Sequence, residues 1–498
     1  MLKRNLIANF LGQGWTALMG LAFIPLYIKY LGIEAYGLIG LFALLQAWLG
    51  LLDMGLTPTL GREMARFTGG NHSAESIRDL MRSVELIALG IAVFIVVGIA
   101  FSADWIATTW LKADNLSNHV VRQAFVVMGF VTAIRFFEGV YRSAIVGLQR
   151  QVLFNSINSL MATLRAFGSI CVLIWVSASI EAFFIWQALV SIATLFILAA
   201  NTYACLPPGK RGARFSIEAI RGVWRFAGGM IGITFLALLL TQVDKILLSK
   251  LLSLSEYGYY TLAAVVASAL FMLISPITQA FYPRLCELHT LGDQPALVNI
   301  YHMGAQLVTV LAGSVAIVMI LFSETFLRLW TQDTVLAERT APLLSLLILG
   351  NLLNSLMWMP YQTQLAHGWT SLTVRINIIA VAVIVPAILW VTPRYGAEGA
   401  AWVWVALNAG YVLIGVQFMY RHILRAEKWA WYWNDVVKPL VAGLIVAMTF
   451  ATLWPVRSGI LSDLALISLV SISTVSASLI AADQIRHQVK KLMTKYHF

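Results

Sequence analysis

The sequence has few charged residues and only three cysteines, and each shortage excludes a class of protein. Only 11% of the 498 residues are Asp, Glu, Lys or Arg, whereas 60% are hydrophobic. Soluble domains carry about 25% charged and about 45–50% apolar residues, so a chain built of soluble domains is excluded. Cys171, Cys205 and Cys286 lie far apart and show neither a metal-ligand spacing nor a disulfide framework.

Motifs for intrinsic chemistry are also missing. The sequence contains no Walker A, HExxH or GxSxG motif, and its eight histidines are scattered. A loose GxGxxA pattern at residues 12–17 lies inside an apolar helix with no strand before it, so it is not a nucleotide site. We therefore expect no bound cofactor, no intrinsic ATP drive and no enzymatic activity that depends on these motifs.

What the sequence has instead is a series of apolar segments of about twenty residues, which is the length that crosses a bilayer. The predicted fold is an all-α polytopic membrane protein with about fourteen transmembrane helices. The predicted spans are residues 8–29, 37–60, 83–103, 121–147, 152–177, 180–203, 225–249, 256–280, 303–323, 341–364, 371–391, 396–420, 436–454 and 460–482.

The basic residues divide the loops between these spans into two sets. The set that includes both termini carries twenty Lys and Arg, and the opposite set carries eight. Because cytoplasmic loops collect Lys and Arg, this bias predicts that both termini are cytoplasmic and that the number of spans is even. The same rule accounts for much of the net charge of +11, for which an anionic substrate is the alternative explanation.

A short internal repeat indicates two six-helix lobes. Residues 28–38 (IKYLGIEAYGL) and 249–259 (SKLLSLSEYGY) match at an offset of 221 residues. Both copies lie between the first and second helix of a six-helix block, which predicts lobes related by an axis along the membrane normal. The predicted division is an N-terminal lobe at 1–205, a C-terminal lobe at 206–430, and two additional helices with a basic tail at 431–498.

Charged residues within the spans are the candidates for function, because an isolated charge at the bilayer centre costs about 2.5–3.5 kcal/mol. Arg135, Glu138 and Arg142 share one face of the fourth span. Arg135 lies about 18 Å from the cytoplasmic end, and Arg165 has a similar depth in the fifth span. Two guanidiniums near one carboxylate predict a net positive site that binds phosphate groups. A structural Arg–Glu pair between the two helices is the alternative.

The second span ends in a segment that carries an acid and two helix-disrupting residues. Asp53 is followed by Gly55 and Pro58, as in the broken helices of transporters, and then by Arg62. We expect Asp53 to serve in coupling or gating and Arg62 to bind substrate. A kinked helix end, with Asp53 capping it or pairing with Arg62, is the alternative.

The seventh span carries Asp244 and Lys245 side by side. Asp244 is a candidate for ion coupling or gating, and Lys245 for substrate binding. The alternatives are an ion pair with a neighbouring helix and a Lys245 side chain that extends to the outer surface. The candidate substrate-binding residues are thus Arg135, Arg165, Arg142, Lys245 and Arg62, and the coupling or gating candidates are Asp53, Glu138 and Asp244.

Several short segments resemble the O-antigen type polysaccharide flippases of the multidrug/oligosaccharidyl-lipid/polysaccharide exporter superfamily. The resembling segments are Asn5 and Asn9, Pro25, Tyr30-Leu31-Gly32, Ala35-Tyr36-Gly37-Leu38, Leu52-Asp53-Met54-Gly55-Leu56, Arg62-Glu63-Met64-Ala65-Arg66, and Tyr395-Gly396-Ala397-Glu398-Gly399-Ala400-Ala401-Trp402. The pattern of apolar segments extends the resemblance over the whole chain.

The resemblance implies two six-helix lobes around a central cavity, two extra helices, and alternating access in a bacterial inner membrane. It also implies a function, the transfer of an undecaprenyl-diphosphate-linked oligosaccharide to the outer leaflet for cell-surface polysaccharide synthesis. Proton or Na⁺ coupling follows by analogy. The implied partners are this lipid-diphosphate oligosaccharide, membrane lipids and other membrane proteins of polysaccharide assembly, with no nucleic acid.

Three alternative functions stay open to different degrees. An ion-coupled drug or cation antiporter of the same superfamily would favour an acidic cavity, whereas the deep charges here lean cationic. A glycan polymerase or ligase would need a sizeable external loop with catalytic residues, and the predicted outside loops reach only about seventeen residues. A lipid-binding scaffold without transport activity is not distinguished by the sequence.

Overall fold

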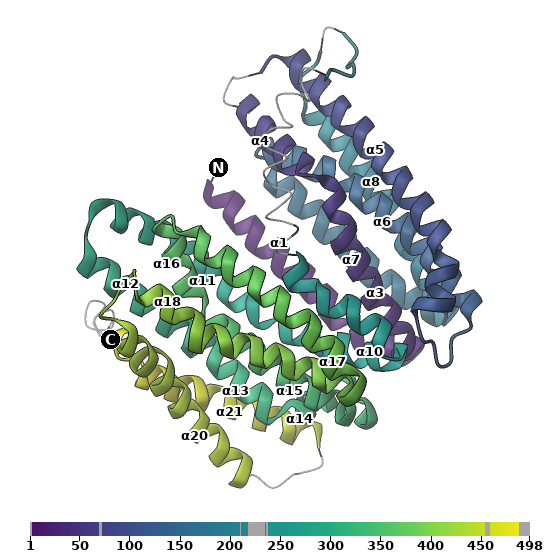
Figure 1. The fold of residues 1–498 in the computed structure, drawn as a ribbon. Coiled ribbons are helices and arrows are strands. Elements are labelled where there is room, and N and C mark those ends of the chain that lie inside the picture. Colours follow the sequence, from purple (N-terminus) through teal and green to yellow (C-terminus); the bar gives the residue numbers. More distant parts are fainter. Residues whose placement is uncertain are drawn as a thin grey trace. The chain divides into compact units, whose positions relative to one another are not determined.

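The computed structural model describes residues 2–68, 72–209, 211–217, 235, 238–453 and 459–487. All regular structure in these residues is helical, as predicted. Twelve of the helical segments are long and apolar enough to cross a membrane. The chain divides into two compact units, Met1–Gly258 and Tyr259–Phe498 (Figure 1). The predicted lobe boundaries at 205 and 430 stay predictions.

The N-terminal unit is a bundle in which α5, α6 and α8 run side by side and α1 packs on α7 (Figure 1). Gly32, with a φ of 85°, lies between the helix that ends at Leu31 and the helix that begins at Ile33. The chain turns between these two helices at this glycine. The helices of this unit are α1 (Leu2–Ala22), α2 (Ile24–Leu31), α3 (Ile33–Leu49), η1 (Gly50–Asp53), α4 (Leu56–Thr68), α5 (Ala74–Trp105), η2 (Ile106–Trp110), α6 (Asn118–Gly147), α7 (Gln151–Trp175) and α8 (Ile180–Cys205).

The second predicted span is broken, which the residues at its centre explain. Helix α3 ends at Leu49 and passes through η1 into Met54 and Gly55, whose φ angles are 46° and 77°. Gly55 adopts this left-handed conformation readily, whereas Met54 is strained there. The chain then restarts as α4, so Asp53 stands at a break between two helical pieces.

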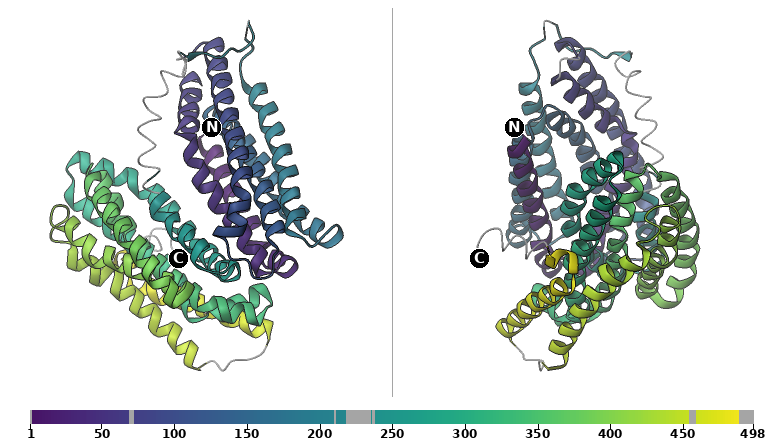
Figure 2. Two further views of the ribbon diagram at one scale, coloured as in Figure 1. Left: turned by 45° about the vertical axis from the view of Figure 1, so that its right-hand side comes forward. Right: turned by 90° about the vertical axis from the view of Figure 1, so that its left-hand side faces the viewer.

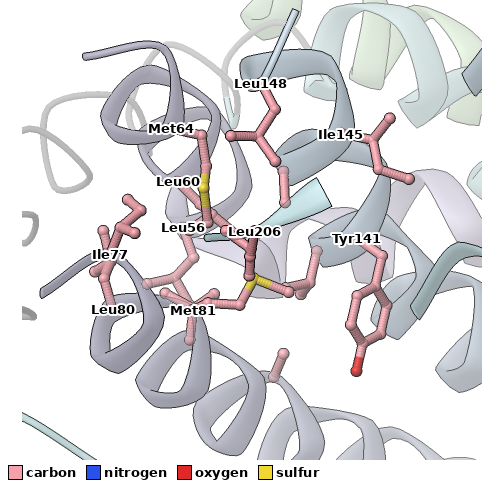
Figure 3. Close-up of a cluster of buried hydrophobic side chains, with 14 of the residues drawn as sticks. Leu56, Leu60, Met64, Ile77, Leu80, Met81, Tyr141, Ile145, Leu148 and Leu206 are labelled. Atoms are coloured by element: carbon pink, nitrogen blue, oxygen red, sulfur yellow. The ribbon is translucent and has the colours of Figure 1, made fainter. Parts of the chain in front are cut away.

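A buried apolar cluster holds α4 against α5 and α6. Leu60 and Met64 on α4 pack with Met81 on α5, Ile145 on α6 and Leu206, which follows α8 (Figure 3). Figure 3 shows these side chains gathered between α4 and its neighbouring helices. The cluster fixes the second piece of the broken span, and with it the position of Asp53, relative to the bundle.

The two copies of the sequence repeat contact each other reciprocally. An added Cβ on Gly37 would lie 2.6 Å from the carbonyl oxygen of Leu254, and one on Gly258 would lie 2.4 Å from that of Ile33. An offset of 221 residues converts Gly37 into Gly258 and Ile33 into Leu254. A contact in which each copy presents the same surface to the other is characteristic of a two-fold axis. The geometry therefore supports the predicted internal repeat.

In the C-terminal unit, the last two helices, α20 and α21, run side by side and pack on α13 (Figures 1 and 2). Four π-helical turns interrupt the N- and C-terminal units, three of them here. The helices are α10 (Leu254–Ser268, which begins in the N-terminal unit), α11 (Leu270–Leu291), α12 (Gln294–Val308), η3 (Thr309–Gly313), α13 (Ser314–Leu321), α14 (Ser323–Thr331), α15 (Thr334–Leu356), α16 (Trp358–Ala366), α17 (Thr370–Gly410), η4 (Tyr411–Gly415), α18 (Val416–Tyr420), α19 (Lys428–Ala430), η5 (Trp431–Val437), α20 (Lys438–Leu453) and α21 (Ile460–Ala481).

Twelve long segments are compatible with about fourteen spans. The segment Ser371–Tyr420 has 50 residues. At 1.5 Å per residue it would extend about 75 Å, more than twice a hydrocarbon core of about 30 Å. Gly396, with φ 60° and ψ −149°, breaks it near the predicted boundary between 371–391 and 396–420. Residues 225–234, 236 and 237 of the predicted span 225–249 lie outside the described residues, and residues 238–251 are helical.

Several predicted helix ends are wrong by more than four residues. Helix α5 begins at Ala74, whereas the sequence predicts a start at residue 83. Its first turns carry Asp79, whose charge obscures the span and which pairs with Arg211 at 2.5 Å. The predicted outside loops at 104–120 and 324–340 are largely helical, because η2 and α14 continue the chain there.

Candidate functional site: a cationic cavity in the N-terminal unit

The broken second span, α6 and α7 together line a cavity of about 400 Å³ in the N-terminal unit. Five charged residues line it: Asp53, Arg135, Glu138, Arg142 and Arg165. Each of them is a candidate from the sequence, and the structure brings all five together. Three guanidiniums against two carboxylates give the lining a formal charge of +1 when all five are ionised.

Arg135 is held by neutral groups. Its Nη1 donates to Gln46 Oε1 at 3.2 Å, its Nη2 to Gln187 Oε1 at 2.9 Å, and its Nε to Ser191 Oγ at 3.4 Å. The guanidinium also lies 5.0 Å from the ring centroid of Phe42, within the range of a cation–π contact. Its orientation is therefore fixed while its charge is left available to an anion.

Arg165 belongs to the same polar network through neutral groups. Gln187 Nε2 donates to Ser169 Oγ at 3.1 Å, and Ser169 Oγ donates to the backbone oxygen of Arg165 at 2.7 Å. The Nε of Arg165 is buried and has no hydrogen-bond partner in the described part of the chain. Buried polar groups are almost always paired. This N–H beside the cavity is therefore positioned to donate a hydrogen bond to an oxygen atom of a ligand or water.

The predicted alternative of an Arg–Glu pair between α6 and α7 is not observed. None of the ion pairs formed within 4 Å by the described residues includes Glu138, Arg135 or Arg165. Glu138 Oε1 is buried without a hydrogen-bond partner there. The carboxylate moderates the positive charge of the cavity from a distance and does not neutralise either arginine by direct contact.

Asp53 caps the second piece of the broken span. Its carboxylate accepts from the backbone N–H of Thr57 at 3.1 Å and from the Thr57 hydroxyl at 2.9 Å. An acid at the N-terminal end of a helix also interacts favourably with the helix dipole. The predicted capping by Asp53 is confirmed, and its pairing with Arg62 is not.

Arg62 lies in a different cluster from the cavity. Its Nη2 donates to Glu63 Oε1 at 2.7 Å, and Arg66 and His72 bind the same carboxylate at 3.2 and 2.8 Å. Burial acts to raise the pKa of Glu63, but the hydrogen bonds from His72 and Arg62 and the charge of Arg66 hold it below its ordinary value. Arg62 is not among the residues that line the cavity, and Glu63 binds its guanidinium. The substrate-binding role of Arg62 stays a prediction.

Asp244 and Lys245 do not line the cavity either. Lys245 Nζ donates to the backbone oxygen of Thr241 at 3.2 Å and to Gln242 Oε1 at 3.1 Å, both on its own helical turn. The coupling role of Asp244 and the substrate-binding role of Lys245 stay predictions.

Sequence reasoning missed the neutral side chains that orient Arg135. Gln46 and Gln187 are uncharged, so a search for charges within spans passes over them. A signal was present, since each is an amide within an otherwise apolar segment, where polar side chains usually have a partner.

The comparisons with known proteins decide the family. The family model described as polysaccharide biosynthesis protein matches residues 2–289, more than half of the chain. The chain belongs to this family. The chain is also similar to the putative O-antigen transporter of Shigella flexneri, with 20% identity over 401 residues, which cover 80% of this chain and 93% of the relative.

Solved structures with a similar fold include two kinds of transporter. The lipid II flippase MurJ, in an inward closed conformation, has a TM-score of 0.68 and 13% identity to this chain. The match covers 95% of this chain and 98% of the MurJ chain. An inward-facing MATE family transporter of the MOP superfamily has a TM-score of 0.65 and 14% identity, covering 83% and 96%. The predicted family resemblance and the predicted polytopic all-α fold are thus confirmed.

Proposed function

We propose that the protein moves an undecaprenyl-diphosphate-linked oligosaccharide from the cytoplasmic to the outer leaflet of a bacterial inner membrane by alternating access. Both termini are then cytoplasmic, and the partners are this lipid, the surrounding membrane lipids and other membrane proteins of polysaccharide assembly. The name of the Shigella relative and the fold shared with a lipid II flippase support this function. Coupling to protons or Na⁺ is part of the proposal.

The proposal rests on the charge of the cavity and on the neutral partners of Arg135. A guanidinium that is already neutralised by a carboxylate has little attraction left for a phosphate, whereas one held by amides keeps its full charge. Arg135 and Arg165 also offer planar forks of donors that suit phosphate oxygens. A cavity of about 400 Å³ is in the range of small-ligand sites, so it would accept the diphosphate and adjoining atoms, not the whole glycan.

An ion-coupled antiporter of organic cations is the second candidate. Asp53 and Glu138 line the same cavity, and the fold is shared with MATE multidrug transporters. The balance of three arginines to two acids favours the anionic substrate.

The test is transfer of a fluorescent lipid-diphosphate oligosaccharide between the leaflets of proteoliposomes. We expect Arg135→Gln and Arg165→Gln to lower the rate roughly 10- to 100-fold each, which corresponds to about 1.5–3 kcal/mol for a hydrogen bond to a charged group. Arg135→Lys retains the charge but loses the planar fork, so it should recover part of the rate. Arg394→Gln is the matched control, because that guanidinium lies on an exposed helix surface and bonds to the backbone of Trp390.

Two results would contradict the proposal. If both cavity variants transfer the lipid at the wild-type rate, the two arginines serve in packing and the cavity is not a phosphate-binding site. Efflux of a small organic cation without any transfer of glycan lipid would favour the antiporter.

A further inference from the structure

The C-terminal unit contains a cluster of three ionisable side chains, two buried and one partly exposed, that is separate from the cationic cavity. His302 on α12 is 6% exposed, and Asp435 on η5 is 1% exposed. The Nδ1 of His302 lies 2.5 Å from Asp435 Oδ2, and its Nε2 lies 3.0 Å from Glu427 Oε2. Both nitrogens of one imidazole ring therefore face carboxylate oxygens.

This geometry requires an additional proton. A neutral imidazole has one N–H and one lone pair, so it can donate to only one of two carboxylates. The second contact would place a lone pair against a carboxylate oxygen. Both contacts form only if the ring carries two N–H groups or if one carboxyl group is protonated. The observed arrangement therefore holds one proton more than a neutral ring with two ionised acids.

The cluster connects the last two helices to the rest of the unit. Gln306, one turn after His302 on α12, donates from Nε2 to Asp435 Oδ1 at 2.9 Å. The backbone N–H of Gln484, just beyond α21, donates to Gln306 Oε1 at 2.9 Å. Asp435 lies directly before α20, so the start of α20 and the end of α21 are both bonded to α12 through this network.

Apolar packing around the polar network is limited at this end of the helix pair. Val310, Ala482 and Ile485 form a small buried cluster beside it. The opposite end has a larger apolar contact, in which Ile317 packs with residues such as Leu466. The polar network therefore carries much of the attachment at the end where His302 lies.

The other titratable groups near the ring are tyrosines. Tyr301 lies beside His302 with ring centroids 5.3 Å apart, and its hydroxyl bonds to that of Tyr420 on α18. Tyr432 on η5 also interacts electrostatically with Tyr301. The charged side chains that act on His302 are Asp435 and Glu427. Neutral phenols do not compensate the charges of the two acids, so the proton on the cluster decides its net charge.

Loss of that proton would weaken the attachment. Two ionised carboxylates would then lie against a neutral ring, and the buried one, Asp435, would lack a proton or counter-charge, which is costly. At least one His302 contact would break, and water would have to enter beside η5. A π-helical segment such as η5 is a place where a helix can change its hydrogen bonding at low cost.

We propose that His302, Asp435 and Glu427 form a proton-binding site that holds the α20–α21 pair against α12 while the proton is bound. The site is independent of the cationic cavity and does not require the function proposed above. Under this proposal, the contact of α20 and α21 with α12 depends on pH.

The first experiment follows docking directly in the full chain in lipid nanodiscs. Spin labels are placed by Val335→Cys on α15 and Ile445→Cys on α20, both exposed positions away from the cluster, after Cys171, Cys205 and Cys286 are changed to Ser. Distances are measured from about pH 5 to about pH 9, which brackets the ordinary titration of histidine. We expect a single narrow distance at low pH and a longer, broader distribution at high pH.

Variants show whether the transition belongs to this cluster. His302→Gln removes the titrating ring, so its distance distribution should be the same at both ends of the pH range. Glu427→Gln, a milder change at the more exposed acid, should still fold and should shift the midpoint of the transition. His422→Gln is the matched control, because His422 is an exposed histidine of the same unit that bonds to the backbone of Phe418. The distance distribution of this variant should change with pH as in the wild type.

Two outcomes overturn the proposal, and neither concerns transport. A wild-type distance distribution that does not change with pH would show that the cluster is a fixed structural contact. A pH transition that persists unchanged in both His302→Gln and Glu427→Gln would place the responsible proton elsewhere.

Discussion

The reciprocal contact between the repeat copies gives a quantitative prediction for Gly37→Ala. The new Cβ would lie 2.6 Å from the carbonyl oxygen of Leu254, whereas ordinary contacts begin near 3.4 Å, so the two segments must separate by about 0.8 Å. Alanine favours a helix over glycine by up to about 1 kcal/mol. Overpacking against backbone costs about 1–3 kcal/mol. We expect a net loss of about 1–2 kcal/mol.

The assay is thermal unfolding of the full chain in detergent, with a matched glycine as the control. Gly90 on α5 has no atom within 4 Å of an added Cβ, so Gly90→Ala should be neutral or stabilising. Gly258→Ala should resemble Gly37→Ala, and the double variant should lose less than the sum of the two, because one separation relieves both contacts. If Gly37→Ala is as stable as Gly90→Ala, the close approach of the repeats is refuted.

Two further predictions concern the acids of the N-terminal unit. Glu63 has a pKa below its ordinary value near 4.5, so its contribution to stability should be present above that pH and decline as the pH falls through the lowered value. Glu63→Gln should remove this acid-dependent loss, measured as unfolding midpoint against pH; an unchanged profile would contradict the Glu63 cluster. Asp53→Ala should cost about 0.5–2 kcal/mol by removing the cap of α4, whereas Asp53→Asn should retain most of it. Glycan-lipid transfer that fails in the stable Asp53→Asn variant would assign a role to the negative charge, and normal transfer would restrict Asp53 to capping.

Depth and helical spacing were sufficient to predict the charged lining of the cavity. Arg135, Glu138 and Arg165 meet because two antiparallel helices place residues at equal distance from a shared turn at equal depth. The break at Asp53 was also predictable, since Gly55 accepts a backbone conformation that ends a helix.

The errors arise where a charged residue is satisfied by a partner distant in the sequence. The early turns of helix α5 carry Asp79, which pairs with Arg211, 132 residues later. The His302 contacts span 133 and 125 residues to Asp435 and Glu427. No periodicity within one helix contains that information, because it depends on which helices pack together.

The neutral partners of Arg135 have a consequence for how substrate binding and ion coupling are divided. The side chains of Gln46, Gln187 and Ser191 do not ionise between acid and alkaline physiological pH, so nothing in this set of contacts changes when a proton gradient is imposed. A proton gradient would therefore not break these three hydrogen bonds by titrating Gln46, Gln187 or Ser191. If transport is coupled to protons, as proposed above, the gradient acts through groups other than these three side chains.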